Sequence, residues 1–514
     1  MEKPKSLWEK TASVPPYPSV CGEKNTDVLV IGGGIAGILT AYMLSEKGIR
    51  CIVLEADSLF SGQTGRTTAK ITSQHGILYE KMIRMHGFAK ARAYAEANEA
   101  AIAEYRRIAN DNRIECEMRT LPSYVYSMDK EALTKEAEAA AALGLAASFV
   151  TETGLPFPAA GAVRFENQAQ FHPLKFLTAL LPGLEIYEHS PVLSMKGHTA
   201  ATPRGSVRAR KIVYATNFPK INLPGFYFMR MHRERSHVVA LEGAPVPDGI
   251  YYGADKDGFS LRSTENGIVL LGGAGHRTGK NTEGGSFAAL MQAAKRFFPG
   301  SRAVCGWSAQ DCMTPDHIPY IGRFSKDTPD VYIATGFCKW GMTSAMAAAG
   351  LLRDLIMGKP NRFAPVFSPS RKLAGLGTLL TDGVQTVGSL AKQFFYLPSR
   401  DFHQIPPGHG GIVQIDGRKR RLSGNPSRRE NEAAHRFGQM SASRMRARME
   451  SGGKELGLPV SRLPVRYRRK TARRSCGKGH RKKAVRHVLQ LSCRRAAAPA
   501  RREAAGLLFR RSLP

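Results

Sequence analysis

The sequence predicts an α/β fold built on a parallel sheet, and three observations support this. A short apolar run, Asp27–Ile31, leads through a glycine-rich turn and a stretch of helix-forming residues to a second apolar run, Cys51–Leu54. Two further runs, 211–217 and 331–335, are also apolar and end in small residues. Such runs are typical of strands buried on both faces of a parallel sheet. A length of 514 residues suggests more than one domain.

The glycine-rich turn has the spacing of a dinucleotide-binding motif. Gly32 permits a tight turn, Gly34 lets the backbone approach a pyrophosphate, and Gly37 lets the helix, which also contains Ala36, pack on the strand. The helix N-terminus offers free N–H groups to an anion. Glu55 ends the second strand, where it can accept hydrogen bonds from an adenosine ribose. The unit therefore predicts dinucleotide binding; the alternative is a glycine-rich turn without a ligand.

Two later segments favour a flavin over a nicotinamide. The loop 61–70 is rich in small and hydroxyl residues and suits a pyrophosphate and a flavin edge. The strand at 331–335 continues into a glycine loop and a helix that runs to about Met357, before Gly358 and Pro360. A helix N-terminus there would stabilise the anionic edge of a reduced flavin. The alternative for this helix is packing alone.

Taken together, these pieces resemble the FAD-dependent D-amino-acid-oxidase and glycine-oxidase family over residues 25–362. The resemblance rests on the glycine turn with Glu55, on Ala215–Thr216, and on the segment 314–322 followed by the loop 336–343. It implies a Rossmann-like FAD-binding domain with a parallel sheet, and an antiparallel-sheet substrate domain over the flavin face. The runs 238–241 and 268–271 fit strands of that second sheet.

The same resemblance assigns domain boundaries and cofactor contacts. The FAD-binding domain would comprise 1–115, 166–225 and 310–362, the substrate domain 116–165 and 226–309, the linker 363–410, and a C-terminal remnant 411–514. Glu55 would hold the adenosine ribose. The remaining FAD contacts expected are Arg66, Thr67 and Thr68 at the pyrophosphate, Val192 at the adenine, Ala215 and Thr216 at a strand end, Gly336 in its loop, and Gly341, Met342 and Thr343 at the flavin pyrimidine edge.

One departure from the family bears on the substrate. Amino-acid oxidases of this family usually place an arginine before the Asp-x-x-Pro motif to bind the substrate carboxylate. Here Asp311 stands at that position, which favours a cationic amine or N-substituted substrate. Arg262 could still bind a carboxylate, Tyr251 or Tyr252 could supply a hydroxyl, and Lys339 could be a cation near the flavin. Each of these could instead be an ordinary structural or solvated residue, as could His237 and His276.

The C-terminal part carries most of the charge of the chain. Residues 418–514 contain 29 Lys and Arg against 5 Asp and Glu, whereas residues 1–417 contain 46 against 37, within a total of +33. A basic arm that binds nucleic acid is one interpretation. It would predict interleaved aromatic residues or a basic helical stripe, and the segment has neither. No specific nucleic-acid partner is therefore expected.

A second interpretation is that this part is translated out of frame. Some members of the resembled family carry a C-terminal Rieske [2Fe-2S] domain, whose first strand resembles 411–417, but its Cys/His boxes are missing here. Read one base later, Met440–Ser441 gives Cys if the serine codon is TCN, and Met445–Arg446 gives Cys if the arginine codon is CGN. Met449–Glu450 gives Trp, and 456–467 permits the second box. We therefore predict a remnant of a Rieske domain, out of frame from about residue 418. FAD is the expected cofactor, and a [2Fe-2S] cluster is expected only in intact relatives.

The remaining composition excludes several classes of protein. Eight scattered cysteines without a Cys-x-x-Cys pair argue against a disulfide framework or a zinc site, so no metal is expected. No run of about 18 apolar residues and no signal-peptide pattern occurs, which predicts no membrane span and a cytoplasmic location. The expected partner is a small amine or amino acid. No motif identifies the electron acceptor.

Overall fold

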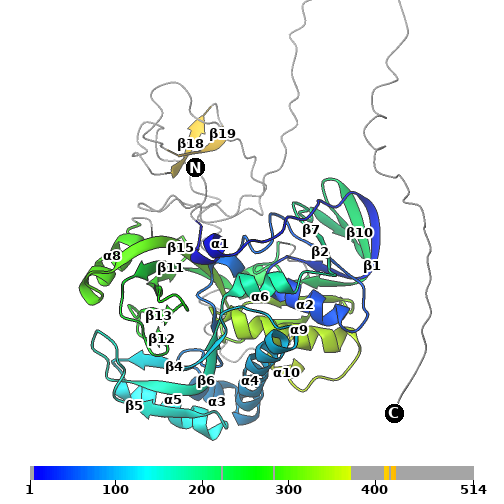
Figure 1. Ribbon diagram of the computed structural model, residues 1–514. Coiled ribbons are helices and arrows are strands. Elements are labelled where there is room, and N and C mark those ends of the chain that lie inside the picture. Colours follow the sequence, from blue (N-terminus) through cyan, green and yellow to red (C-terminus); the bar gives the residue numbers. More distant parts are fainter. Residues whose placement is uncertain are drawn as a thin grey trace, which may run out of the picture. The chain divides into compact units, whose positions relative to one another are not determined.

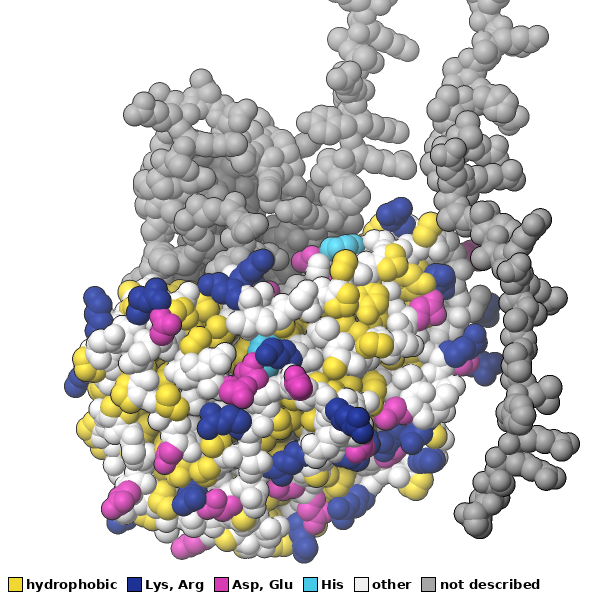
Figure 2. Space-filling model, viewed as in Figure 1, with side chains coloured by type: hydrophobic (Ala, Val, Ile, Leu, Met, Phe, Trp, Pro, Cys, Tyr) yellow, Lys and Arg dark blue, Asp and Glu magenta, His cyan; other side chains and the backbone are white. Residues whose placement is uncertain are grey.

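The computed structural model describes residues 5–220, 224–279, 281 and 284–371, and the backbone of 410–415 and 418–423 (Figure 1). Two large sheets organise the main part of this chain. In the described ranges, no helix is long and apolar enough to cross a membrane. Figure 2 shows one face of the protein, on which Lys and Arg side chains are interspersed with Asp and Glu.

The first sheet is mostly parallel, and the predicted βαβ unit lies at its centre. Strand β1 (Gly22–Ile31) pairs in parallel with β2 on one side and with β10 on the other. The predicted strand at 331–335 is β17, which pairs in parallel with β10, so the expected parallel sheet is confirmed. The other members are β2 (Cys51–Leu54), β7 (Glu185–Tyr187), β8 (Ser194–Lys196), β9 (Thr199–Ala201), β10 (Gly205–Tyr214), β16 (Tyr320–Arg323) and β17 (Val331–Thr335).

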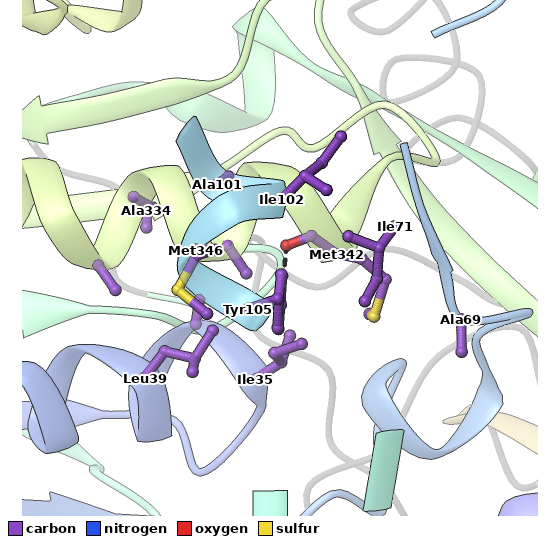
Figure 3. Close-up of a cluster of buried hydrophobic side chains, with 14 of the residues drawn as sticks. Ile35, Leu39, Ala69, Ile71, Ala101, Ile102, Tyr105, Ala334, Met342 and Met346 are labelled. Carbon is purple, nitrogen blue, oxygen red and sulfur yellow. Dashed lines mark hydrogen bonds between the residues drawn. The ribbon is translucent and has the colours of Figure 1, made fainter. Parts of the chain in front are cut away.

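Three helices pack together beside this sheet. Helix α2 (Ile35–Ser45) follows the glycine turn, α4 (Phe88–Asp111) is the longest of the described helices, and α9 (Gly341–Ile356) follows β17. Figure 3 shows where they meet: Leu39, Ile102 and Met346 contribute side chains to one buried cluster. The Tyr105 hydroxyl donates to the Met342 carbonyl at 3.0 Å and fixes α4 against the start of α9.

The second sheet has nine strands and is largely antiparallel. The path runs β15-β11-β14-β13-β12-β4-β6-β3, with β5 also paired to β6. One contact departs from the expected pattern, because β12 pairs with β4 in parallel. The strands are β3 (Lys70–Ile71), β4 (Arg119–Ser127), β5 (Ala147–Val150), β6 (Gly161–Gln170), β11 (His232–Glu242), β12 (Ile250–Gly253), β13 (Ser260–Ser263), β14 (Val269–Arg277) and β15 (Arg302–Met313).

Shorter elements complete the main part. Helix α8 packs on β11 and β14, and α5 packs on β5 and β6. The helix α1 comes before the βαβ unit, and its Trp8 is buried. These elements are α1 (Leu7–Thr11), η1 (Thr64–Arg66), α3 (Tyr79–His86), α5 (Lys130–Ala142), α6 (Pro173–Ala179), α7 (Tyr227–Arg230), α8 (Ser286–Phe297) and α10 (Ala364–Phe367).

The chain after α9 differs from the predicted linker at its start. Phe367 in α10 is buried, and Arg371 forms a buried ion pair with Asp316, so residues up to 371 belong to the folded body. The rest of the predicted linker, residues 372–409, lies outside the described residues. Further on, the segment 411–417, which resembles the first strand of a Rieske domain, overlaps β18 (Gly410–Ile415). Strand β18 pairs in antiparallel fashion with β19 (Arg418–Ser423), which lies in the segment predicted to be out of frame.

Candidate active site

The glycine turn between β1 and α2 has no room for a side chain at Gly32 or Gly37. Gly32 has φ +115°, and a Cβ there would lie 2.7 Å from the Ala215 carbonyl oxygen at the end of β10. A Cβ on Gly37 would lie 1.9 Å from the Gly32 carbonyl oxygen. Gly34 is more open, since a Cβ there would meet only the Thr64 hydroxyl at 3.1 Å. The turn therefore presents bare backbone at the carboxyl end of the sheet, as a dinucleotide requires.

Glu55 lies beside this turn, where the sequence placed it. Its Oε2 accepts the Gly33 N–H at 2.7 Å, and its Oε1 accepts the Asp57 N–H at 2.9 Å. Burial raises the pKa of this carboxyl, and the backbone donors only partly oppose the change. Val192 lies between β7 and β8, partly buried against the core cluster that contains Ile52.

Two buried polar atoms at this edge fit a bound cofactor. Among the described residues, Arg66 Nε and Thr216 Oγ1 are buried and have no hydrogen-bond partner in the protein. An unpaired buried donor is costly, so its partner is usually a ligand or water. Arg66 comes from the loop after β2, and Thr216 follows β10, close to the glycine turn. Together with the bare turn, these residues fit FAD.

The loop 66–69 is held by side chains from distant parts of the chain. Trp307 Nε1 on β15 donates to the Arg66 carbonyl at 2.8 Å, and Trp8 Nε1 on α1 donates to the Thr67 carbonyl at 2.7 Å. Arg262 Nη1 donates to the Thr68 and Ala69 carbonyls at 3.1 and 2.8 Å. Sequence reasoning missed Trp8 and Trp307, because indole groups carry no signal of such long-range contacts.

The contacts of Arg262 correct its predicted role as a carboxylate clamp. Arg262 is 2% exposed, and its guanidinium bonds the carbonyls of Ser263 and Phe171 as well as those of the loop. Burial lowers its pKa to about 9. Because these donors are used on the backbone, we assign Arg262 to positioning the loop.

The loop before α9 has an unusual backbone. Cys338 and Lys339 have φ +49° and +75°, and a Cβ on Gly336 would lie 2.6 Å from the Thr314 side chain. Left-handed residues other than glycine are strained and often mark functional loops. The helix then starts at Gly341, and Thr343 Oγ1 donates to the Thr72 carbonyl at 3.0 Å. The first N–H groups of α9 have no partner within the helix, which suits the electron-rich edge predicted to bind here.

Charged groups gather where this loop meets the second sheet. The Lys339 ammonium lies 2.8 Å from Glu234 Oε2, and His232 Nε2 lies 3.4 Å from Glu234 Oε1. Asp311 on β15 pairs in register with Glu234 on β11. The sequence predicted Lys339 and Asp311 here but missed Glu234 and His232, because an alternating strand does not show which of its residues meet a loop.

The neighbouring tyrosines correct another prediction. Tyr251 stacks on Tyr124 with ring centroids 4.7 Å apart, and its hydroxyl donates to Asp248. Tyr252 contacts Trp340 instead, with centroids 5.0 Å apart. Successive strand residues face opposite sides, so of the two tyrosines it is Tyr252 that meets the loop before α9. In the described residues, no group of His, Cys, Asp and Glu could hold a metal ion.

Comparison with known proteins decides the family. The DAO family model, described as FAD dependent oxidoreductase, matches residues 27–355. The chain belongs to this family. This DAO protein is therefore an FAD-dependent oxidoreductase, and the cofactor predicted from its glycine turn is FAD.

Two curated relatives and one solved structure extend the comparison of this DAO protein. A protein described as a Rieske 2Fe-2S iron-sulfur protein, YhfW of Bacillus subtilis (strain 168), is 35% identical over 437 residues, with 81% of this chain and 86% of the relative covered. Gamma-glutamylputrescine oxidoreductase of Escherichia coli (strain K12) is 23% identical, with 68% and 87% covered. The fold is similar to glycine oxidase from Geobacillus kaustophilus, with a TM-score of 0.59, 18% identity, and 68% and 100% covered.

Proposed function

We propose that this protein oxidises an amine or amino acid by moving a hydride from the carbon that bears nitrogen to FAD. The observation that carries the proposal is the cluster of Lys339, Glu234 and Asp311 next to the start of α9, the helix assigned to the flavin. FAD supplies the hydride acceptor at flavin N5. The protein supplies orientation and charge, which in this chemistry contribute more than a general acid.

Each residue has a role in this proposal. The turn Gly32–Gly37 and Glu55 bind the adenosine half and the pyrophosphate, with Ala36 inside that turn. Val192, Ala215 and Thr216 line the adenine and ribose side. Arg66, Thr67 and Thr68 hold the pyrophosphate. Gly336 forms the strained loop, and Gly341, Met342 and Thr343 present the helix N-terminus to the flavin pyrimidine. Lys339, Asp311 and Tyr252 face the substrate.

Names of relatives support both substrate classes. One relative is called gamma-glutamylputrescine oxidoreductase, and this name contains an amine. One similar solved structure is a glycine oxidase, and this name contains an amino acid. We still propose a substrate domain made of residues 116–165 and 226–309. Its two segments are extended to Gln170 and Met313, because strands β6 and β15 end there. The cytoplasmic location expected from the sequence also remains a prediction.

Anaerobic titration of the purified flavoprotein tests this function. A panel of amines and amino acids is added while the absorbance band of the oxidised isoalloxazine, at about 450 nm, is followed. A substrate bleaches the band without oxygen, and the product is an imine or its hydrolysis product. If dithionite bleaches the flavin but every amine and amino acid leaves it oxidised, the proposal is wrong.

We also propose that intact relatives pass the electrons from FAD to a Rieske cluster, and that this chain has lost the cluster through a frameshift. The relative described as a Rieske 2Fe-2S iron-sulfur protein matches 81% of this chain, which supports a Rieske-associated ancestry. Resequencing the coding DNA across codons 415–425 tests the frameshift. One intact frame, with no single-base change that opens the two Rieske boxes, would exclude it.

A further inference from the structure

Asp311 is a carboxylate to which no described residue donates a hydrogen bond. Its side chain lies on β15, opposite Glu234 on β11, so two carboxyl groups stand side by side on one face of the sheet. Within the described part of the chain, no N–H or O–H group bonds the Asp311 carboxylate. Like charges directly opposite each other in a sheet are unfavourable, so this arrangement requires a compensating cation.

The cation already present is engaged elsewhere. The Lys339 ammonium bonds Glu234 at 2.8 Å, and Glu234 also contacts His232. The His232 and Lys339 contacts hold the pKa of Glu234 at about 2, although burial opposes them. Burial raises the pKa of Asp311 to about 6, Lys339 opposes this change and Glu234 adds to it. The two carboxyl groups therefore differ: Glu234 is paired with protein groups, and Asp311 is left for a ligand.

Aromatic rings and two histidines, His75 and His317, complete the surroundings of the charged cluster. Trp340 contacts Tyr252 with centroids 5.0 Å apart and stacks on His75 at 4.9 Å, which forms an apolar wall next to Lys339. Aromatic faces attract organic cations. His317, in the loop after β15, has a pKa lowered chiefly by burial, so it adds little positive charge near neutral pH.

We propose that Asp311 binds the ammonium group of the substrate and then accepts one of its N–H protons, so the substrate is an amine without a carboxylate on the oxidised carbon. This inference rests on the proposed function, because it concerns the amine oxidised there. The proton moves from nitrogen to an Asp311 oxygen, and nitrogen keeps its lone pair. Bound FAD would supply the acceptor for the hydrogen of the adjacent C–H bond, which would leave as a hydride with both bonding electrons; the nitrogen lone pair would then form the C=N bond, and the product would be an iminium ion.

An α-amino acid is a poor fit to the same cluster. Its carboxylate would have to displace Glu234 from Lys339 while lying close to Asp311. Arg262 offers no alternative, since its guanidinium is buried against main-chain carbonyls. The cluster contains one lysine and two carboxylates, and this balance favours a cation.

The test compares two probes of equal chain length and opposite charge, n-butylammonium and butyrate, on the FAD-loaded protein. Binding is followed through the flavin absorbance change, so turnover is not required. We expect n-butylammonium to bind the native protein and butyrate to bind at least about tenfold more weakly, as charge-assisted hydrogen bonds are the strong ones. Asp311→Asn should weaken n-butylammonium binding about tenfold or more.

Matched variants and pH separate binding from folding. Asp257→Asn, an exposed acid in the turn after β12, should bind n-butylammonium as the native protein does. Asp311→Glu keeps the charge and should retain the preference for the cation even if Asp311→Asn does not fold. In the native protein, n-butylammonium binding should weaken as pH falls through about 6, because Asp311 becomes protonated. Asp311→Asn should lack this dependence.

The outcomes distinguish the two proposals. Stronger binding of butyrate, or unchanged n-butylammonium binding in Asp311→Asn, overturns the role of Asp311. If amino acids still bleach the flavin in that case, the proposed oxidation stands and only this inference fails. If n-butylammonium binds in an Asp311-dependent way but no amine is oxidised, the inference about cation binding stands and the proposed oxidation fails.

Discussion

The indole N–H of Trp8 donates a hydrogen bond of 2.7 Å to the carbonyl oxygen of Thr67, so a helix near the N-terminus holds the loop assigned to the FAD pyrophosphate. Trp8 is 1% exposed and lies 5.3 Å from the Arg262 guanidinium, which holds the next two carbonyls of the same loop. With its carbonyls bonded from outside, the loop has its remaining donors available to an anion. Cofactor affinity should therefore depend on α1.

Trp8→Phe keeps a buried ring and removes this one donor. We expect FAD to dissociate more readily, with an affinity loss of about tenfold, since a buried acceptor left unpaired costs roughly 1–3 kcal/mol. The measurement is FAD binding to the apoprotein, followed by the change in flavin fluorescence. The far-ultraviolet circular dichroism of the apoprotein serves as a folding control. Equal FAD affinity in the variant and the native protein would contradict the prediction.

Two helical glycines form a matched pair for testing the turn. Gly37→Ala in α2 would place a Cβ 1.9 Å from the Gly32 carbonyl oxygen, so the turn must open and FAD binding should be lost. Gly350→Ala in α9 meets no atom within 4 Å. It should leave FAD bound and stabilise the protein by about 0.5–1 kcal/mol, because alanine favours helix more than glycine does. Flavin content after purification and thermal melting give both results. Retention of FAD by Gly37→Ala would show that the turn is looser than described.

The parallel sheet could be predicted because its strands are buried on both faces and so appear as apolar runs. The runs 27–31 and 331–335 are both strands, and each pairs in parallel with β10. The glycine turn and the family resemblance together indicated that these strands belong to one sheet. The short strand β7 carries no such run, since Glu185 and Tyr187 flank one buried isoleucine. No sequence pattern therefore identifies β7, and it is recognised only in the structure, where it pairs in parallel with β2.

The substrate side was harder to predict, because alternation in a strand fixes only that neighbouring residues face opposite sides. Tyr251 and Tyr252 are equivalent in sequence, and the choice between them depends on contact with Trp340, some 90 positions later. Arg262 similarly suggested a carboxylate clamp, but its carbonyl partners come from Thr68, Ala69 and Phe171. Asp311 was found because it departs from a family pattern, which is a signal in the sequence itself.

The buried ion pair between Asp316 and Arg371 predicts a pH dependence of stability. Arg371 Nε and Nη2 donate to the two carboxylate oxygens, each at 2.8 Å, and both side chains are almost fully buried. Burial alone would raise the pKa of Asp316, but Arg371 outweighs it and the pKa is lowered from 3.8. A carboxyl whose pKa is depressed on folding stabilises the protein above its unfolded pKa, and this contribution is lost as pH falls through the folded value.

Asp316→Asn should therefore lower the melting temperature most at neutral pH. Leaving Arg371 buried without its counter-ion costs about 3–5 kcal/mol in comparable cases. The difference in melting temperature between the variant and the native protein should be full at pH 7 and should shrink below about pH 4, where Asp316 takes up its proton. Asp327→Asn, an exposed acid, serves as the control. A difference that stays constant down to the lowest measurable pH would contradict the assignment.

Tyr251→Phe and Tyr252→Phe remove the same hydroxyl from adjacent residues on opposite faces of β12. The Tyr251 hydroxyl donates to Asp248 away from the site, so its loss should lower thermal stability and leave n-butylammonium binding unchanged. Tyr252 contributes to the raised pKa of the Lys339 ammonium, where burial acts in the opposite direction, and it contacts Trp340. Its variant should change the binding of n-butylammonium by about two- to tenfold, the range of a single neutral hydrogen bond, with little change in stability. Flavin absorbance titration and thermal melting of both variants measure the two quantities. If only Tyr251→Phe altered the binding of n-butylammonium, Tyr251 and not Tyr252 would face the substrate, and the prediction would be wrong.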